Sequence, residues 1–411
     1  MIAFPHDPSL PQLVGLADQA VVARALRPHL TPLRVESCRL TRVRYRRGRR
    51  CVLHFAVEVS DGKRRWTQPV TLNAYASPDR ASRTLRKLPE NDSRRAARAR
   101  LGFEPAWLLE ELDALVQAFP FDRRLPALAL LLSGNPGLRV VQYRPGLGAV
   151  LRTAGGSYVK VYREDAWPRP APPASRVLLQ PLEVLDSARA VVLPAAPGTS
   201  LRGDPRPGRI RVVARRLAEL HDSDFTLPRH GAPARAAELE RAAALVGWAA
   251  PETAADASAL VDELAPWLDD TDPRPTHRDL KPDHVFVDGS EVTFIDVDSL
   301  ASADPVLDVA LLVSRLDDRA AALFEQEYFH RVPRAWRDRF HAQLAGALLE
   351  AAASAFRRQQ PSWRERVPAL VHDAIRVSLS GRYAAVPAGN ILSTNPIRLG
   401  QRRAETGGLP S

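Results

Sequence analysis

The fold is decided by residues 276–296, which read THRDLKPDHVFVDGSEVTFID. Two short apolar runs flank Asp288 and Gly289, and an Asp-Gly pair between such runs favours a tight turn joining antiparallel strands. The stretch therefore predicts a β-hairpin. A turn at this point places His284 beside Asp296 at the open end of the hairpin.

The loop that precedes the hairpin is polar and reaches the same end. Four functional side chains are thereby expected together: Asp279, Lys281, His284 and Asp296. Phosphoryl transfer needs a carboxylate that orients and deprotonates the attacking hydroxyl, cations that bind the phosphates, and a divalent metal held by oxygen or nitrogen ligands. These residue types fit that chemistry.

The stretch resembles the catalytic loop of the kinase superfamily, H-x-D-x-x-x-x-N, which is followed after a hairpin by a metal-binding Asp. It is most similar to the aminoglycoside phosphotransferase and choline kinase family. DVD at 296–298 resembles the IDWE or IDFD segment of that family, and DPVLDVA at 304–310 resembles its DPxxDLA helix start. RRLAELH at 215–221 and PGTSL at 197–201 extend the resemblance to roughly residues 138–350.

The resemblance implies a role for each matched residue. Asp279 would be the catalytic base, Lys281 would bind phosphate, and His284 and Asp296 would bind the metal. Lys160, in the alternating YVKVY of residues 158–162, takes the place of the strand lysine that binds the α- and β-phosphates. Residues expected to support the site are His277, Arg278, Asp298 and Asp308.

Lysine is rare in this chain, because the cations are almost all arginines. The lysines are Lys63, Lys87, Lys160 and Lys281, and two of these fall on kinase motif positions. The implied activity is that of a small-molecule kinase with ATP and Mg²⁺ or Mn²⁺ as cofactors. The expected acceptor is a hydroxyl of a sugar, an amino sugar such as an aminoglycoside, or an amino alcohol.

His284 departs from the family pattern, which has Asn at this position. A neutral imidazole binds Mn²⁺ or Zn²⁺ more readily than Mg²⁺. Because the protonated ring cannot bind metal, activity is expected to fall below about pH 6.5. In the competing interpretation His284 only packs at the hairpin mouth, while Asp283 or water completes the metal shell. Histidine at 221 is expected to cap a helix C-terminus.

A second departure lies after Lys160. The helix that usually carries a glutamate partner for the strand lysine is replaced by Glu164, Asp165 and the proline-rich residues 168–173. This gap and His284 motivate an alternative function, a nucleotide-binding pseudokinase that regulates a partner.

An internal repeat precedes the motif region. YRPGLGAVL at 143–151 echoes YRRGRRCVL at 45–53, and each copy leads into a further strand. Asn73 in the first copy stands where Lys160 stands in the second, so the first copy should not bind phosphate. It resembles the N-terminal cap subdomain of maltokinases.

The composition narrows the classes of function. The net charge is +11, and residues 1–100 hold 21 Lys or Arg against 8 Asp or Glu. A solvated arginine-rich surface is favoured over nucleic-acid binding, because no helix-turn-helix, finger or RNA-recognition signature accompanies it. Cys38 and Cys51 cannot form a disulfide framework. With no secretory signal or membrane span expected, the sequence predicts a cytoplasmic protein.

The whole pattern predicts an α+β, protein-kinase-like fold with two lobes, a small β-rich N-lobe and a mostly helical C-lobe, plus an additional N-terminal cap subdomain. The expected parts are a basic cap at 1–135, an N-lobe at 136–200, a C-lobe at 201–394 and a disordered tail at 395–411. Periodicity further predicts helices over 16–30 and 107–118.

Overall fold

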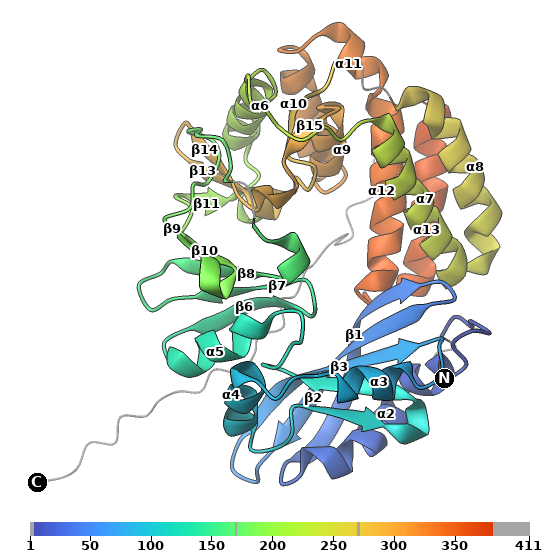
Figure 1. Cartoon of the computed structure of the whole chain (residues 1–411). Coiled ribbons are helices and arrows are strands. Elements are labelled where there is room, and N and C mark those ends of the chain that lie inside the picture. The colour runs from blue at the N-terminus through green and yellow to red at the C-terminus, as the bar shows by residue number, and fades with distance from the viewer. Residues whose placement is uncertain (1–3, 169–170, 269–271, 381–411) are drawn as a thin grey trace, which may run out of the picture. The chain divides into compact units, whose positions relative to one another are not determined.

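The computed structural model describes residues 4–168, 171–268 and 272–380. It divides into two compact units (Figure 1). Among the described residues, the first contains the chain up to Trp167 together with Leu185–Ala190, and the second contains Pro168–Val184 and the chain from Val191 to Ser380. The predicted boundaries at 135 and 200 stay predictions, and the predicted tail lies outside the described residues.

A five-stranded antiparallel sheet forms the core of the first unit, in the order β1-β2-β3-β5-β4. Its first three strands contain the first copy of the sequence repeat. The strands are β1 (Arg34–Arg46), β2 (Arg50–Ser60), β3 (Arg65–Tyr75), β4 (Ala106–Leu109) and β5 (Ala114–Ala118), with the helices α3 (Arg80–Arg86) and α4 (Asp92–Leu101) between β3 and β4.

The predicted helix over 16–30 is wrong as a single element. The chain instead forms α1 (Leu13–Ala17), α2 (Gln19–Leu26) and the 3₁₀ turn η1 (Arg27–Leu30). Asp18 has extended backbone, and its carboxylate accepts hydrogen bonds from the amides of Ala20 and Val21. This N-cap begins α2 and so separates it from α1.

The predicted helix over 107–118 is wrong too. Those residues form β4, the 3₁₀ turn η2 (Glu110–Leu112) and β5, and Asp113 takes a left-handed conformation between them. All five residues of β5 are buried. A strand buried on both faces is a continuous apolar run, which periodicity alone does not distinguish from a helix.

A second five-stranded sheet has the equivalent order, β6-β7-β8-β10-β9. Its strands are β6 (Arg139–Arg144), β7 (Gly148–Arg152), β8 (Tyr158–Tyr162), β9 (Glu183–Leu185) and β10 (Ala190–Leu193). The helix α5 (Pro126–Gly134) precedes it, and the 3₁₀ turns η3 (Glu164–Ala166) and η4 (Asp186–Ala188) connect its later strands. The sequence repeat therefore extends to a repeated sheet.

Each YRxG turn of the repeat is bound by an aspartate that precedes the first strand of its own sheet. In both copies the carboxylate accepts from the tyrosine hydroxyl and the glycine amide of the turn. The bonds are Tyr45–Asp7 at 2.7 Å, Gly48–Asp7 at 3.0 Å, Tyr143–Asp122 at 3.0 Å and Gly146–Asp122 at 2.5 Å.

Strand register confirms the equivalence of Asn73 and Lys160. Val52 on β2 pairs with Asn73 on β3, and Val150 on β7 pairs with Lys160 on β8. Both valines occupy the same position relative to the tyrosine of their YRxG turn. One repeat thus carries an amide where the other carries an ammonium.

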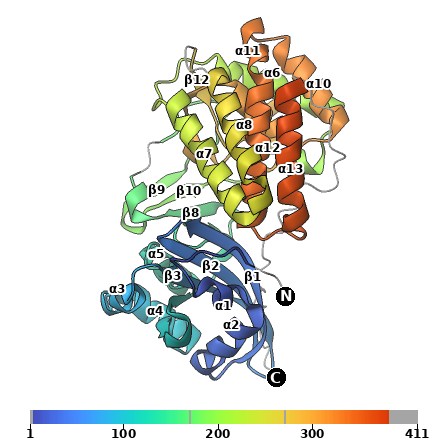
Figure 2. The same cartoon turned by 90° about the vertical axis from the view of Figure 1, so that its right-hand side faces the viewer.

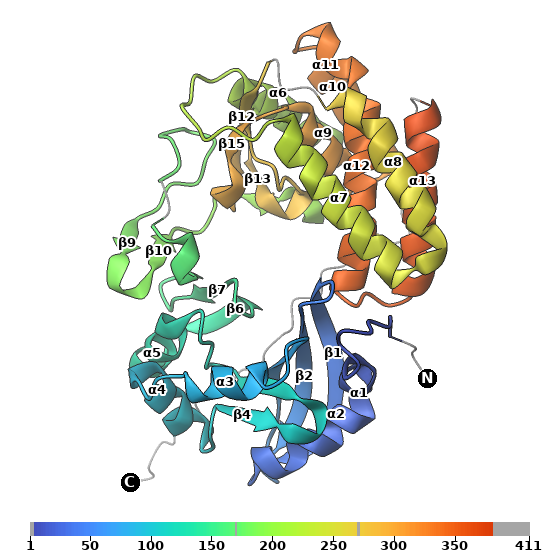
Figure 3. The same ribbon diagram turned by 45° about the vertical axis from the view of Figure 1, so that its right-hand side comes forward.

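Helices dominate the second unit, in which α7, α8, α12 and α13 run side by side (Figures 2 and 3). The helices are α6 (Pro207–His221), α7 (Ala232–Ala249), α8 (Ala254–Leu264), α9 (Val306–Val313), α10 (Asp318–Phe329), α11 (Arg334–Asp338), α12 (Phe340–Arg357) and α13 (Trp363–Ser380). The expected α+β class is confirmed. Among the described residues, no helix combines the length and apolar character needed to cross a bilayer.

Short strands complete the second unit. One sheet has the order β11-β13-β14, and β12 pairs with β15. Their bounds are β11 (Thr199–Ser200), β12 (Arg274–Thr276), β13 (Val285–Asp288), β14 (Glu291–Phe294) and β15 (Ala301–Ala303). The 3₁₀ turns are η5 (Leu201–Gly203), η6 (Pro251–Thr253), η7 (Ala265–Trp267), η8 (Pro282–His284) and η9 (Val297–Ser299).

Candidate active site

The predicted hairpin is confirmed in β13 and β14. Asp288 opposes Glu291, and the turn between them contains Gly289 with a positive φ of 59°. At the open end, the amide of Ile295 donates to the carbonyl of His284 at 3.0 Å. The backbone therefore brings His284 and the residue after Ile295 to the same end of the hairpin.

The segment before β11 packs closely on β13, the first strand of this hairpin. Gly198 has a φ of 78°, and a Cβ at this position would collide with the backbone carbonyl of Val287. Ser200 then donates its hydroxyl to the carbonyl of Pro282 at 3.0 Å. The PGTSL segment supports the hairpin from the β13 side, and only glycine fits at its closest approach.

Asp308, in the first turn of α9, fixes the backbone of the predicted catalytic loop. Its carboxylate accepts from the amide of His277 at 2.6 Å and from the amide of Arg278 at 2.8 Å. The carboxylate is fully buried. It therefore holds the two residues immediately before Asp279 in place.

His221 extends this buried network instead of capping its helix. Its Nε2 lies 3.2 Å from the Asp308 carboxylate, and its Nδ1 lies 2.6 Å from the hydroxyl of Tyr328. Burial and the nearby Asp308 raise the pKa of Tyr328 well above its usual value, so the hydroxyl remains a donor. Tyr328 thus donates to His221, which in turn donates to Asp308. The helix-capping role expected for His221 is not observed.

Arg278 turns away from the hairpin, with a positive φ of 65°. Its guanidinium donates to Glu238 at 2.8 Å and to the carbonyl of Ser299 at 3.3 Å, and it contacts His230 at 2.9 Å. Glu238 and His230 were not predicted, because nothing in the local sequence shows that α7 reaches the loop. Glu238 thus binds Arg278, the residue next to Asp279, and it also pairs with Arg235 at 3.4 Å.

His277 joins the loop to the end of β14. Its Nε2 donates to the carbonyl of Ile295 at 2.8 Å, and its Nδ1 accepts from the amide of Asp279 at 3.3 Å. The ring is completely buried. This arrangement agrees with the supporting role predicted for His277.

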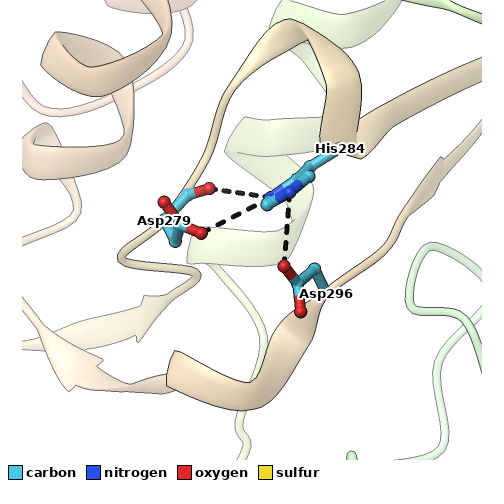
Figure 4. Close-up of side chains that lie close together, drawn as sticks. All are labelled: Asp279, His284 and Asp296. Carbon is cyan, nitrogen blue, oxygen red and sulfur yellow. Dashed lines mark hydrogen bonds and ion pairs between the residues drawn. The ribbon is translucent and has the colours of Figure 1, made fainter. Parts of the chain in front are cut away.

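Asp279, His284 and Asp296 meet at the hairpin mouth (Figure 4). One potential ligand atom from each lies within 4.8 Å of the others. Nε2 of His284 is 3.3 Å from Asp296 Oδ2, and Nδ1 is 3.9 Å from Asp279 Oδ2. The structure thus brings together the predicted base and the two predicted metal ligands.

The hydrogen bonding of His284 determines which nitrogen can bind a cation. Nδ1 lies 2.9 Å from the carbonyl oxygen of Asp279, an acceptor, so Nδ1 carries the proton. In the neutral ring the lone pair of Nε2 then points toward the carboxylate of Asp296. Two electron-rich atoms facing each other in this way suit a bound cation.

Burial lowers the pKa of His284 to about 3, helped by the charge of Lys281. The carboxylates of Asp296 and Asp279 oppose this shift without reversing it. The imidazole is therefore neutral throughout the ordinary pH range. The sequence placed the protonation of this ring near pH 6.5, and its burial, which the sequence does not reveal, moves that protonation to lower pH.

Lys281 lies beside Asp279, with its Nζ 3.2 Å from the carboxylate. Burial raises the pKa of Asp279, but Lys281 and His284 outweigh that effect, and the pKa lies below its usual value. Asp279 is thus ionised at neutral pH. Its side chain remains 42% exposed, so a substrate can reach it.

The other predicted residues occupy different surroundings. Asp283 pairs with Arg202 at 3.1 Å and is not among the three described residues that could together hold a metal ion. Asp298 lies in η9, just beyond Asp296. Lys160 belongs to the first unit, where its Nζ lies 5.6 Å from the ring centroid of Tyr162.

The structure thus defines an α+β protein whose helical unit carries a hairpin with a histidine and two carboxylates at its mouth. Residues 157–340 match the model of a family described as the phosphotransferase enzyme family. The resemblance inferred from the catalytic-loop residues is thereby confirmed for this part of the chain. None of the curated proteins compared with the chain matches it.

Solved structures of kinases and phosphotransferases are similar to part of the chain. Macrolide 2'-phosphotransferase MphH from Brachybacterium faecium is 17% identical, with a TM-score of 0.40, and the match covers 58% of this chain and 92% of that one. Choline kinase LicA from Streptococcus pneumoniae is 13% identical, with a TM-score of 0.43 and coverage of 59% and 94%.

Proposed function

We propose that this protein transfers the γ-phosphate of ATP to a hydroxyl group of a small molecule. One observation supports the proposal. The carboxylate of Asp279, the proposed base, and the potential metal ligands His284 and Asp296 each place one atom within 4.8 Å of the others at one end of the hairpin. This hairpin lies inside the segment that matches the phosphotransferase family. The chemistry of the group and the family match point to the same reaction.

Asp279 would orient the acceptor hydroxyl and accept its proton. Its lowered pKa keeps it ionised at neutral pH, and its partial exposure leaves an approach for the acceptor. Lys281, 3.2 Å away, would bind phosphate oxygens as charge develops on them. Lys160 would bind the other phosphates of the nucleotide.

His284 and Asp296 would hold the divalent cation, Mg²⁺ or Mn²⁺. The Nε2 lone pair and the Asp296 carboxylate face each other at 3.3 Å, which fits a shared cation. When bound, the metal neutralises phosphate charge during transfer. Because His284 supplies nitrogen in place of an amide oxygen, we expect Mn²⁺ to support activity better than Mg²⁺.

The acceptor is proposed to be a sugar, an aminoglycoside or another amino sugar, or an amino alcohol. We also propose a cytoplasmic location, because Cys38 and Cys51 are buried free thiols. Transfer of labelled γ-phosphate from ATP should be screened over these acceptor classes, with Mg²⁺ and Mn²⁺ in parallel. The Asp279→Asn variant serves as the inactive control.

Acceptor-dependent transfer by the wild-type chain, absent in Asp279→Asn, supports the proposal. The replacement of Asn by His284 favours one alternative, a nucleotide-binding pseudokinase. Saturable ATP binding without transfer to any acceptor class, under either metal, would favour that alternative and contradict the proposed enzyme.

A further inference from the structure

Several arginines lie at one end of the first sheet, and none of them has a role predicted from the sequence. Arg46 on β1 pairs directly with Arg50 on β2, and Arg50 pairs on its other side with Tyr75 on β3. Arg44 lies two residues before Arg46 and shares its face of the strand. Like charges placed directly opposite each other in a sheet are destabilising. A negatively charged group bound between these arginines would offset their repulsion.

A separate segment brings further arginines to the same place. Gly146 has a φ of 63°, and a Cβ there would lie 3.1 Å from Nη2 of Arg44 and 3.4 Å from Cδ of Arg124. The side chains of Arg44 and Arg124 therefore converge on one turn. The preceding Arg123 is close enough to Arg50 to repel its charge.

The acidic residues nearby are already engaged. Asp122 accepts from the amides of Gly146 and Arg124 and from the hydroxyl of Tyr143. Asp165 binds Arg124 at 2.6 Å. The two carboxylates of Asp122 and Asp165 therefore do not balance the positive charge of the arginines at this end of the sheet.

Buried donors in this region also lack partners. Nε of Arg44 and the hydroxyl of Tyr75 are both buried, and neither has a hydrogen-bond partner among the residues that the structure describes. Tyr75 is only 5% exposed. Burial lowers the pKa of Arg44 to about 10, assisted by Arg50 and Arg124 and opposed by Asp122. Unpaired buried donors with excess positive charge are the features of an anion site.

We propose that this arginine cluster, defined as Arg44, Arg46, Arg50, Arg123 and Arg124, binds a phosphate group. The first copy of the repeat was expected not to bind phosphate because it has Asn73 in place of a lysine, but these arginines supply positive charge of their own. Guanidinium groups bind phosphate oxygens in pairs, and arginines from β1, β2 and the loop after Asp122 would surround such a ligand. Tyr75 can add its hydroxyl as a further donor. The site is independent of the catalytic group, so it does not depend on the proposed transfer activity.

The test measures anion binding to the full chain by calorimetry at constant ionic strength. Inorganic phosphate, pyrophosphate and a hexose phosphate are titrated separately into the wild-type chain and into the Arg44→Gln, Arg46→Gln and Arg50→Gln variants. Arg46 is exposed, so its variant should fold even if Arg44→Gln does not. Arg64→Gln, at an exposed position between β2 and β3, is the matched charge control.

Pyrophosphate affinity should fall at least tenfold in Arg46→Gln and Arg50→Gln but remain unchanged in Arg64→Gln. Tighter binding of hexose phosphate than of inorganic phosphate would assign the site to a phosphorylated metabolite, and equal binding would assign it to free phosphate.

Two results would overturn the proposal. These are no measurable binding of any of the three anions and an equal loss of affinity in Arg64→Gln. A DNA duplex that displaces pyrophosphate, with affinity falling steeply as salt rises, would also overturn it in favour of a nucleic-acid surface.

Discussion

Replacing His284 by Asn should make the folded chain less sensitive to acid. The imidazole is 6% exposed, and burial lowers its pKa to about 3. In the unfolded chain the same ring has a pKa of about 6.5. Between these values the unfolded chain binds a proton that the folded chain does not, so the free energy of unfolding falls as the pH falls through this window.

The size of the effect follows from the two pKa values. At pH 4.5 the unfolded ring is almost fully protonated, while the folded ring is still almost fully neutral. The wild-type chain should therefore lose about 2.7 kcal/mol of unfolding free energy between pH 8 and pH 4.5 through this group alone. Asn does not titrate, so the variant should be spared this loss.

Urea denaturation of the metal-free chain in EDTA, at pH 7.5 and pH 4.5, measures the difference. Apart from Asp279, whose pKa His284 helps to lower, the other titrating groups are common to both chains, so the difference reports mainly on His284. His330→Asn, at an exposed histidine, is the matched control and should keep the wild-type pH dependence. If wild type and His284→Asn lose the same stability on acidification, the assignment of a buried neutral imidazole is wrong.

Other predictions concern rate and packing. Asp279→Asn should lower the transfer rate on the order of 10²- to 10⁴-fold while retaining ATP binding, and an unchanged rate in a single-turnover assay would remove this residue from the mechanism. Lys160→Ala should weaken ATP binding measured by calorimetry, whereas Asn73→Ala should not; equal effects would contradict the functional asymmetry of the repeat. Gly198→Ala should destabilise the chain by about 2 kcal/mol or more in urea titrations, because its Cβ meets the carbonyl of Val287, and a change within error would show that the segment can move away.

Local sequence was sufficient for the hairpin. The Asp288-Gly289 turn and its flanking apolar runs determine the register, which places His284 opposite Ile295, the residue before Asp296. Contacts that depend on distant segments were not predictable in the same way. The bond from Arg278 to Glu238 spans 40 residues and depends on how α7 packs.

Burial explains the remaining differences. β5 was mistaken for helix because all of its residues are buried, which removes the alternation that identifies a strand. The pKa of His284 was placed near its ordinary value because a sequence gives no measure of desolvation. In both cases the missing information is the tertiary environment.

The paired aspartates of the two sheets have a consequence for the order of assembly. Asp122 binds Tyr143 across 21 residues, whereas Asp7 binds Tyr45 across 38. By the loop-closure relation, the longer connection costs about 0.5 kcal/mol more chain entropy. We therefore expect the turn of the second sheet to close first as the chain folds, and the N-terminal sheet to complete its own turn later.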